Sequence, residues 1–240
     1  MASSQLKALA AYSACDISDA LLKLKVPGAG LLADITPIAT TATAISATKT
    51  IALASTVLLV SKPSASFPQP HPPPPDPTSL PEPNIKTGTP YADLTTPDTV
   101  VLLSQPAGQK CAVVGGIMAA RMKVLGAKGI VVDGRVRDLV SLGALGMPIW
   151  SRATSTVGSG AESRPWAHNV PITIGGVRVE PGDIIILDPA ENGVVSIPKS
   201  KLDAVLRLLP RMVAADEKVM EDVEKGVEVA EAFRRHRSNL

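Results

Sequence analysis

The sequence is short of aromatic residues, cysteine and net charge, and each shortage argues against a class of protein. Phe, Trp and Tyr contribute two residues each to the 240, scattered singly, so no stacking platform for unpaired bases is visible. The 24 basic and 22 acidic residues give a net charge of +2, far from the basic footprint of a nucleic-acid binder. We therefore expect no nucleic-acid partner. Cys15 and Cys111 form no motif, which favours a reducing compartment.

Long hydrophobic runs are also lacking. The N-terminal residues 1–5 have no basic patch followed by an apolar run, so they do not form a secretory signal. The most apolar stretch, from Thr43 to Val60, contains Lys49 and many hydroxyl residues, and it is more typical of β-structure than of a membrane span. We expect no membrane partner and a cytoplasmic location.

Proline is abundant, but mainly in one place. Ten of the 22 prolines lie between Pro63 and Pro83, including a run of four at positions 72–75. Proline joins neither a sheet ladder nor a helix interior, so an insert at about 62–90 should be polyproline II or loop. We interpret it as a surface insertion between two strands; a ligand for an aromatic-lined groove is the alternative.

The remaining pattern is that of an α/β protein. Residues 100–152 alternate strand, helix, strand, helix and strand, which predicts a sheet with a parallel component. A hairpin is expected around Gly175-Gly176. The other expected elements are a helix at about 6–24, two strands between 35 and 60, strands at 184–187 and 194–197, and a helical C-terminal extension at about 199–237. We expect one domain over residues 1–240.

The strongest candidate site lies between Gly115 and Asp138. The glycine pair Gly115-Gly116 opens a predicted helix, whose first N–H groups suit a carboxylate or phosphate. A following strand ends near Arg137 and Asp138. Arginine can bind a carboxylate through two hydrogen bonds, and aspartate can bind a hard divalent cation. The same pair could equally be a structural salt bridge, with Asp138 capping the helix that it begins.

Gly116, twenty intervening residues and then Arg137-Asp138 form a G-x20-R-D motif. With this motif, the chain resembles the RraA-like family, which includes class II 4-hydroxy-4-methyl-2-oxoglutarate aldolases and regulators of ribonuclease activity. The likeness covers nearly the whole chain except the proline-rich insert. Flanking matches include residues 125–129, 133–134, 170–172, 181–183 and 193–195.

The resemblance implies an αββα sandwich that assembles as a homotrimer, or as a hexamer of two trimers, with the site at a subunit interface. It implies a divalent cation, Mg²⁺ or Mn²⁺, held by Asp138. Arg137 would contact a small 2-oxo acid as the catalytic arginine. Backbone groups at Gly115, Gly116, Ile117 and Met118 would bind the carboxylate of that substrate.

The implied activity is that of a metal-dependent lyase. Such an enzyme cleaves or decarboxylates a 2-oxo dicarboxylic acid, such as 4-hydroxy-4-methyl-2-oxoglutarate or oxaloacetate, through a metal-stabilised pyruvate enolate. Arg137 and the N–H groups of the turn would add positive potential where charge accumulates.

Two positions depart from the family pattern. Gly116 and Ser141 stand where aldolases of the family commonly carry carboxylates, so efficient aldol cleavage is less expected than binding of metal and keto acid. Asp216 or Glu217 from a neighbouring subunit could supply a replacement. The alternatives are a non-catalytic binding or regulatory protein, and a related metal-enolate enzyme with a changed substrate.

Overall fold

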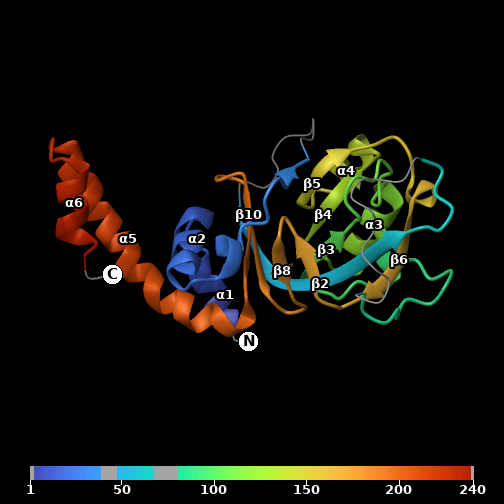
Figure 1. The fold of residues 1–240 in the computed structure, drawn as a ribbon, viewed down its shortest axis with the longest axis horizontal. Helices are drawn as coiled ribbons and strands as arrows, with labels where there is room; N and C mark the ends of the chain where they lie inside the picture. The colour runs from blue at the N-terminus through green and yellow to red at the C-terminus, as the bar shows by residue number, and fades with distance from the viewer. Residues whose placement is uncertain (1–2, 39–47, 68–79, 239–240) are drawn as a thin grey trace.

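A computed structural model describes residues 3–38, 48–67 and 80–238 (Figure 1). The α-helices are α1 (Ser3–Leu9), α2 (Ala14–Lys23), α3 (Gly116–Val124), α4 (Leu139–Ala144), α5 (Leu202–Glu224) and α6 (Val229–His236). The strands are β1 (Thr36–Pro37), β2 (Thr50–Ser61), β3 (Thr99–Ser104), β4 (Gly129–Val136), β5 (Ile149–Thr154), β6 (Ser163–His168), β7 (Ile172–Ile174), β8 (Val177–Val179), β9 (Ile184–Asp188) and β10 (Gly193–Ile197). Short 3₁₀ turns lie at Pro27–Gly30, Tyr91–Leu94, Ser159–Ala161 and Lys199–Lys201.

One mixed sheet organises the chain. Its strand order is β1-β5-β4-β3-β2-β9-β10, and β6 also pairs with β2. The three pairings from β2 to β5 are parallel, and helices α3 and α4 join β3 to β4 and β4 to β5, as expected for parallel neighbours. In contrast, β9, β10 and β6 pair antiparallel. The hairpin of β7 and β8 forms a separate two-stranded sheet around Gly175 and Gly176, both of which have positive φ.

Side-chain alternation divides the core into three hydrophobic clusters. On β9, Ile185 and Leu187 face the interior, where they share a cluster with β3, β4 and the β7–β8 hairpin. The alternate residues Ile184 and Ile186 face α2 and α5. A third cluster lies between β3–β4 and the helices α3 and α4. The layer sequence is therefore helix, sheet, sheet, helix, which confirms the αββα sandwich.

The predicted N-terminal helix at 6–24 is wrong in its continuity, because it is two helices. The first ends at Leu9, and Ser13 caps the second: its hydroxyl accepts a hydrogen bond from the Asp16 N–H, while the Asp16 carboxylate accepts one from the Ser13 N–H. This reciprocal capping box starts a new helix and turns the chain.

Of the two strands expected between 35 and 60, β1 is only two residues long and β2 is twelve. Residues 39–47 lie outside the described part. So does the proline run at 72–75, within 68–79. The described end of the insert runs beside β6, where the Asn84 side chain donates to the His168 carbonyl and accepts from the His168 N–H.

The C-terminal extension is helical, as predicted, with Pro210 inside α5. The first part of α5 packs on α2, and its far part carries α6 away from the sheet (Figure 1). Among the described residues, no helix is long and apolar enough to cross a membrane.

Candidate functional site

The start of α3 and the end of β4 meet, as the sequence predicts. An isolated bridge pairs Val114 with Val136, and the Arg137 N–H donates to the Val114 carbonyl at 3.0 Å. These contacts hold the segment before α3 beside the end of β4. Gly115 is the N-cap of α3 and has no side chain to cap the helix. A neighbouring group can therefore approach the first N–H of α3.

That group is the carboxylate of Asp138. Its Oδ2 accepts a hydrogen bond from the Gly116 N–H at 3.0 Å. Asp138 has φ +61° and ψ +46°, a left-handed conformation that aspartate tolerates better than most residues. Asp138 is also the N-cap of α4, but its side chain makes no capping hydrogen bond to that helix. The carboxylate thus stabilises the N-terminus of α3 rather than of the helix that follows it.

Arg137 lies beside this carboxylate with its head group partly open to solvent. The Arg137 Nε is 3.9 Å from the Asp138 Oδ2, and the two side chains are 44% and 45% exposed. At that exposure the ion pair contributes little to stability, so the guanidinium is available to a ligand. Gly158, which no sequence pattern singles out, has its α-carbon against the Arg137 guanidinium.

Gly116 and Ser141 lie face to face next to Asp138. A Cβ added at Gly116 would lie 2.8 Å from the Ser141 Cβ and 3.7 Å from the Asp138 Cβ. Gly116 and Ser141, the two positions without the expected carboxylates, are therefore direct neighbours in the structure. Ile117, at the first turn of α3, has a side chain 86% exposed, while Met118 packs on the core below.

The donor atoms at this place suit a hard divalent cation with few protein ligands. No cluster of three or more His, Cys, Asp or Glu side chains occurs in the described parts of the chain. Asp138 offers one carboxylate, and Ser141 offers a hydroxyl nearby. Magnesium is commonly bound through one or two carboxylates, with water and substrate oxygens completing the shell. The residues thus fit Mg²⁺ or Mn²⁺ better than a metal that needs nitrogen or sulfur ligands.

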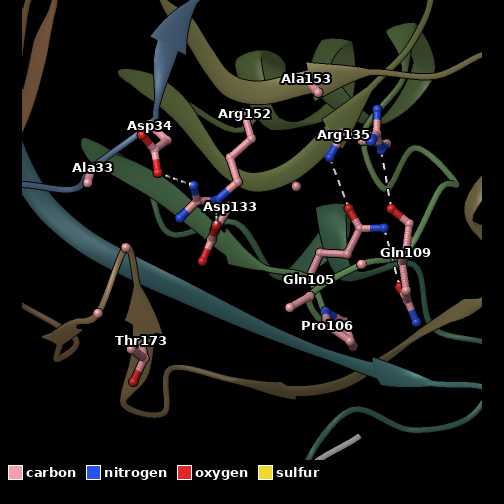
Figure 2. Close-up of a pocket in the computed structure, with 15 residues that line it drawn as sticks. Ala33, Asp34, Gln105, Pro106, Gln109, Asp133, Arg135, Arg152, Ala153 and Thr173 are labelled. Carbon is pink, nitrogen blue, oxygen red and sulfur yellow. Dashed lines mark hydrogen bonds and ion pairs between the residues drawn. The ribbon is translucent and has the colours of Figure 1, made fainter. Parts of the chain in front are cut away.

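A cavity of about 550 Å³ lies elsewhere, at the carboxyl ends of β3, β4 and β5 (Figure 2). Its lining contains none of the predicted site residues. In it, Arg152 bridges Asp133 and Asp34, with an Arg152 Nη1–Asp34 Oδ2 distance of 3.1 Å. Burial raises the pKa of Asp133, and the hydrogen bond and charge of Arg152 oppose that rise.

Gln105 closes the floor of this cavity. Its Oε1 accepts from the Arg135 N–H at 2.9 Å, and its Nε2 donates to the Cys111 carbonyl at 2.9 Å. The polar groups on this side are therefore mostly paired with one another. Sequence patterns did not indicate this cavity, since Asp34, Gln105 and Arg152 come from three distant segments.

The other sequence candidates lie apart from Arg137 and Asp138. Asp216 is on the far part of α5, where its Oδ1 accepts from the Arg237 Nε at 2.5 Å. Glu217 follows it and is exposed. His168 lies on β6 beside Ser55, and His236 contacts Asp222. His71 lies outside the described residues.

Comparison with known proteins finds relatives that match about half of the chain. A protein of Halalkalibacterium halodurans named "Putative 4-hydroxy-4-methyl-2-oxoglutarate aldolase" is 36% identical over 121 residues, which are 50% of this chain and 56% of that protein. "Uncharacterized protein MJ0644" of Methanocaldococcus jannaschii is 32% identical over 51% of this chain and 57% of its own length. The chain thus spans little more than half the length of these curated relatives.

Solved structures share the fold over nearly the whole chain. Streptomyces coelicolor RraAS2, described as an unusual member of the RNase ES inhibitor RraA protein family, has a TM-score of 0.67 at 23% identity, covering 94% of this chain and 97% of that one. An uncharacterized protein from Pseudomonas syringae pv. tomato has a TM-score of 0.69 at 23% identity, covering 97% and 98%. The RraA-like family, described as Aldolase/RraA, matches residues 14–196, and the chain belongs to this family.

Proposed function

We propose that the protein is a divalent-metal-dependent lyase acting on a small 2-oxo dicarboxylic acid, with its site at Arg137 and Asp138. The observation that carries this proposal is the Asp138 carboxylate lying on the first N–H of α3, with the Arg137 guanidinium beside it. A carboxylate, a guanidinium and a helix N-terminus together can bind a cation and an anionic substrate at one place.

Each residue has a separate role. Arg137 binds a carboxylate of the substrate and orients it, and the N–H groups at the start of α3 add positive potential where negative charge develops. Asp138 would hold Mg²⁺ or Mn²⁺ through its carboxylate. When bound, the cation supplies Lewis-acid stabilisation of charge on the keto oxygen of the substrate.

Gly116 and Ser141 make decarboxylation the better supported reaction. When oxaloacetate loses CO₂, the electron pair of the breaking C–C bond moves toward the keto group, and a proton from water then completes pyruvate. No base is needed for the bond to break. Retro-aldol cleavage of 4-hydroxy-4-methyl-2-oxoglutarate also requires removal of the hydroxyl proton, and neither Gly116 nor Ser141 supplies a carboxylate for it.

An apolar rim around this place supports assembly into a homotrimer or a hexamer with the site at a subunit interface. The rim is formed by Ile117 on α3 and by Leu139 and Val140 on α4, with exposed fractions of 86%, 41% and 86%. Large apolar side chains exposed together are typical of contact surfaces.

The test is pyruvate release from oxaloacetate and from 4-hydroxy-4-methyl-2-oxoglutarate, with and without Mg²⁺, after subtraction of the protein-free rate. We expect Mg²⁺-dependent release, faster with oxaloacetate, and its loss in Arg137→Ala and Asp138→Ala. Arg178→Ala is the matched control, because Arg178 is an exposed arginine paired with Glu180 on the β7–β8 hairpin. Activity that survives in both site variants would refute the proposal.

A non-catalytic regulatory role is the second candidate. The observation in its favour is that the Asp138 carboxylate already has a structural partner in the Gly116 N–H. Under this alternative, the unsubstituted protein releases no pyruvate from either substrate, so Arg137→Ala and Asp138→Ala have no effect in the lyase assay. The purified protein would instead inhibit a ribonuclease of the E type in a direct cleavage assay, and deletion of residues 63–83 would test whether the insert contributes.

A further inference from the structure

Two glycines lie on either side of the Arg137 side chain. A Cβ added at Gly115 would lie 3.2 Å from both the Cγ and the Nε of Arg137. A Cβ added at Gly158 would lie 3.1, 3.3 and 3.4 Å from its Nη1, Cζ and Nη2. Gly115 therefore borders the middle of the side chain, whereas Gly158 borders the guanidinium head itself.

Neither glycine is required by its backbone conformation. Gly115 has φ −133° and ψ −177°, and Gly158 has φ −75° and ψ +162°. Both pairs of angles lie in the extended region that any L-residue adopts. What glycine provides at both positions is space. Beside Gly115 that space is taken first by the Asp138 Oδ2, which would lie 2.7 Å from an added Cβ, and then by Arg137, whereas beside Gly158 it is taken by the Arg137 guanidinium alone.

The backbone at Gly158 is well anchored. The Ala112 N–H donates to the Val157 carbonyl at 2.7 Å, and the Ser155 N–H donates to the Val136 carbonyl at 2.9 Å. An isolated parallel bridge also pairs Ala112 with Gly158. Gly158 is thus tied to the segment that precedes α3 and to the end of β4, the two elements that carry the candidate site.

We infer that Gly158 is a positioning residue for Arg137, forming with Gly115 a slot that restricts the guanidinium to one orientation. The inference rests on the proposed function, because the slot matters to a reaction only if Arg137 binds substrate. A long arginine side chain loses conformational freedom when it binds a ligand. A slot that holds the head group beforehand reduces that loss and aims its N–H groups.

Gly158→Ala separates positioning from folding. The added methyl meets the far end of a flexible side chain rather than backbone, so the guanidinium should shift by a few tenths of an ångström while the fold remains. Gly160→Ala is the matched control, because a Cβ at Gly160 meets nothing within 4 Å. Gly158→Val should displace the guanidinium further.

The first readout needs neither substrate nor metal. In ¹⁵N–¹H spectra of the full chain, the Nε–H resonance of Arg137 is assigned by its disappearance in Arg137→Lys. We expect this resonance to move in Gly158→Ala and to stay in place in Gly160→Ala. An unmoved resonance in Gly158→Ala would overturn the inference, whether or not the protein proves to be a lyase.

The second readout is kinetic. Gly158→Ala should raise KM for oxaloacetate about tenfold, the order of loss expected for a misplaced binding group, with a smaller change in kcat. In an Arg137→Lys background the guanidinium is gone, so Gly158→Ala should have no further effect on KM. Equal effects in both backgrounds would show that Gly158 acts through the fold, and would refute a positioning role even if Gly158→Ala proves less stable.

Discussion

The carboxylate of Asp138 accepts a hydrogen bond from the backbone N–H of Gly116, the first residue of α3, at 3.0 Å. Twenty-two positions separate the two residues in sequence, so this bond joins the end of β4 to the start of α3. The Asp138 carboxylate thus has a structural role in this bond and a proposed role in metal binding. Substitutions at position 138 can separate the two roles.

Asp138→Ala removes the acceptor and the charge, whereas Asp138→Asn keeps a side-chain oxygen that can accept the Gly116 N–H. We expect Asp138→Ala to lower the free energy of unfolding by about 1 kcal/mol, the usual effect of losing a helix cap, and Asp138→Asn to lower it less. Both should abolish Mn²⁺ binding, measured by titration calorimetry beside denaturant unfolding. Equal stability losses would contradict the capping role.

Gly116 and Ser141 should be energetically coupled, because a Cβ at Gly116 would lie 2.8 Å from the Ser141 Cβ. We expect Gly116→Ala to destabilise the protein by about 1 to 3 kcal/mol through overpacking. Ser141→Gly should relieve that clash, so a double-mutant cycle should show coupling of about 1 kcal/mol or more. If the stability changes of the two single variants simply add in the double variant, the starts of α3 and α4 move apart easily and the two residues are not coupled.

Arg152 should stabilise the protein more at neutral pH than at acid pH. Burial raises the pKa of Asp133 above its unfolded value, so the carboxylate destabilises the fold increasingly as pH rises through the folded pKa. Removing Arg152 raises that pKa further. We expect Arg152→Ala to cost about 1 to 3 kcal/mol near pH 7 and less near pH 4, measured by urea unfolding.

The control for this pH dependence is Asp133→Asn, which removes the titrating group. In that background Arg152→Ala should cost nearly the same free energy at both pH values. A pH-dependent loss that persists in that background would contradict the assignment to Asp133.

The α5–α6 hairpin should loosen in acid. Hydrogen bonding to His236, and then to Arg235, lowers the pKa of Asp222 below its usual 3.8. Hydrogen bonds from Arg234 and Arg235 also lower the pKa of Glu231. A depressed carboxyl pKa stabilises the fold above the unfolded value and loses that effect as pH falls through the folded value. We therefore expect weaker protection of the α6 amides below about pH 4, measured as the hydrogen-exchange rate relative to the intrinsic rate at the same pH.

Asp222→Asn should give the same weaker protection of α6 at neutral pH, and the protection of this variant should change little in acid. Glu224→Gln, at an exposed acid on the same helix, is the matched control and should change neither. Protection of α6 that is unchanged in Asp222→Asn would show that apolar packing alone holds the hairpin.

The sequence predicted those parts of the fold that depend on local residue chemistry. Gly175-Gly176 turns the β7–β8 hairpin as predicted, with positive φ at both residues. The meeting of Arg137 with the start of α3 also follows from the pattern, because the carboxyl ends of neighbouring parallel strands share one edge of the sheet.

The sequence could not predict features that depend on distant partners. Strand β6 contains Pro165 and shows little apolar alternation, so no local pattern predicts it; it is a strand because it pairs with β2. The space beside Arg137 depends on Gly158, which follows it by twenty-one positions and has an ordinary backbone conformation. No residue pattern near either position records that contact.

Strand β2 shares one of its edges between two partners. On one side it pairs with β3; on the other, its first residues pair with β9 and its last with β6. All these pairings join segments far apart in the chain, which slows folding because long loops must close first. Neither half of the sheet can be completed until β2 is in place. The chain should accordingly fold as one cooperative unit, and the formation of the β2 pairings should limit its folding rate.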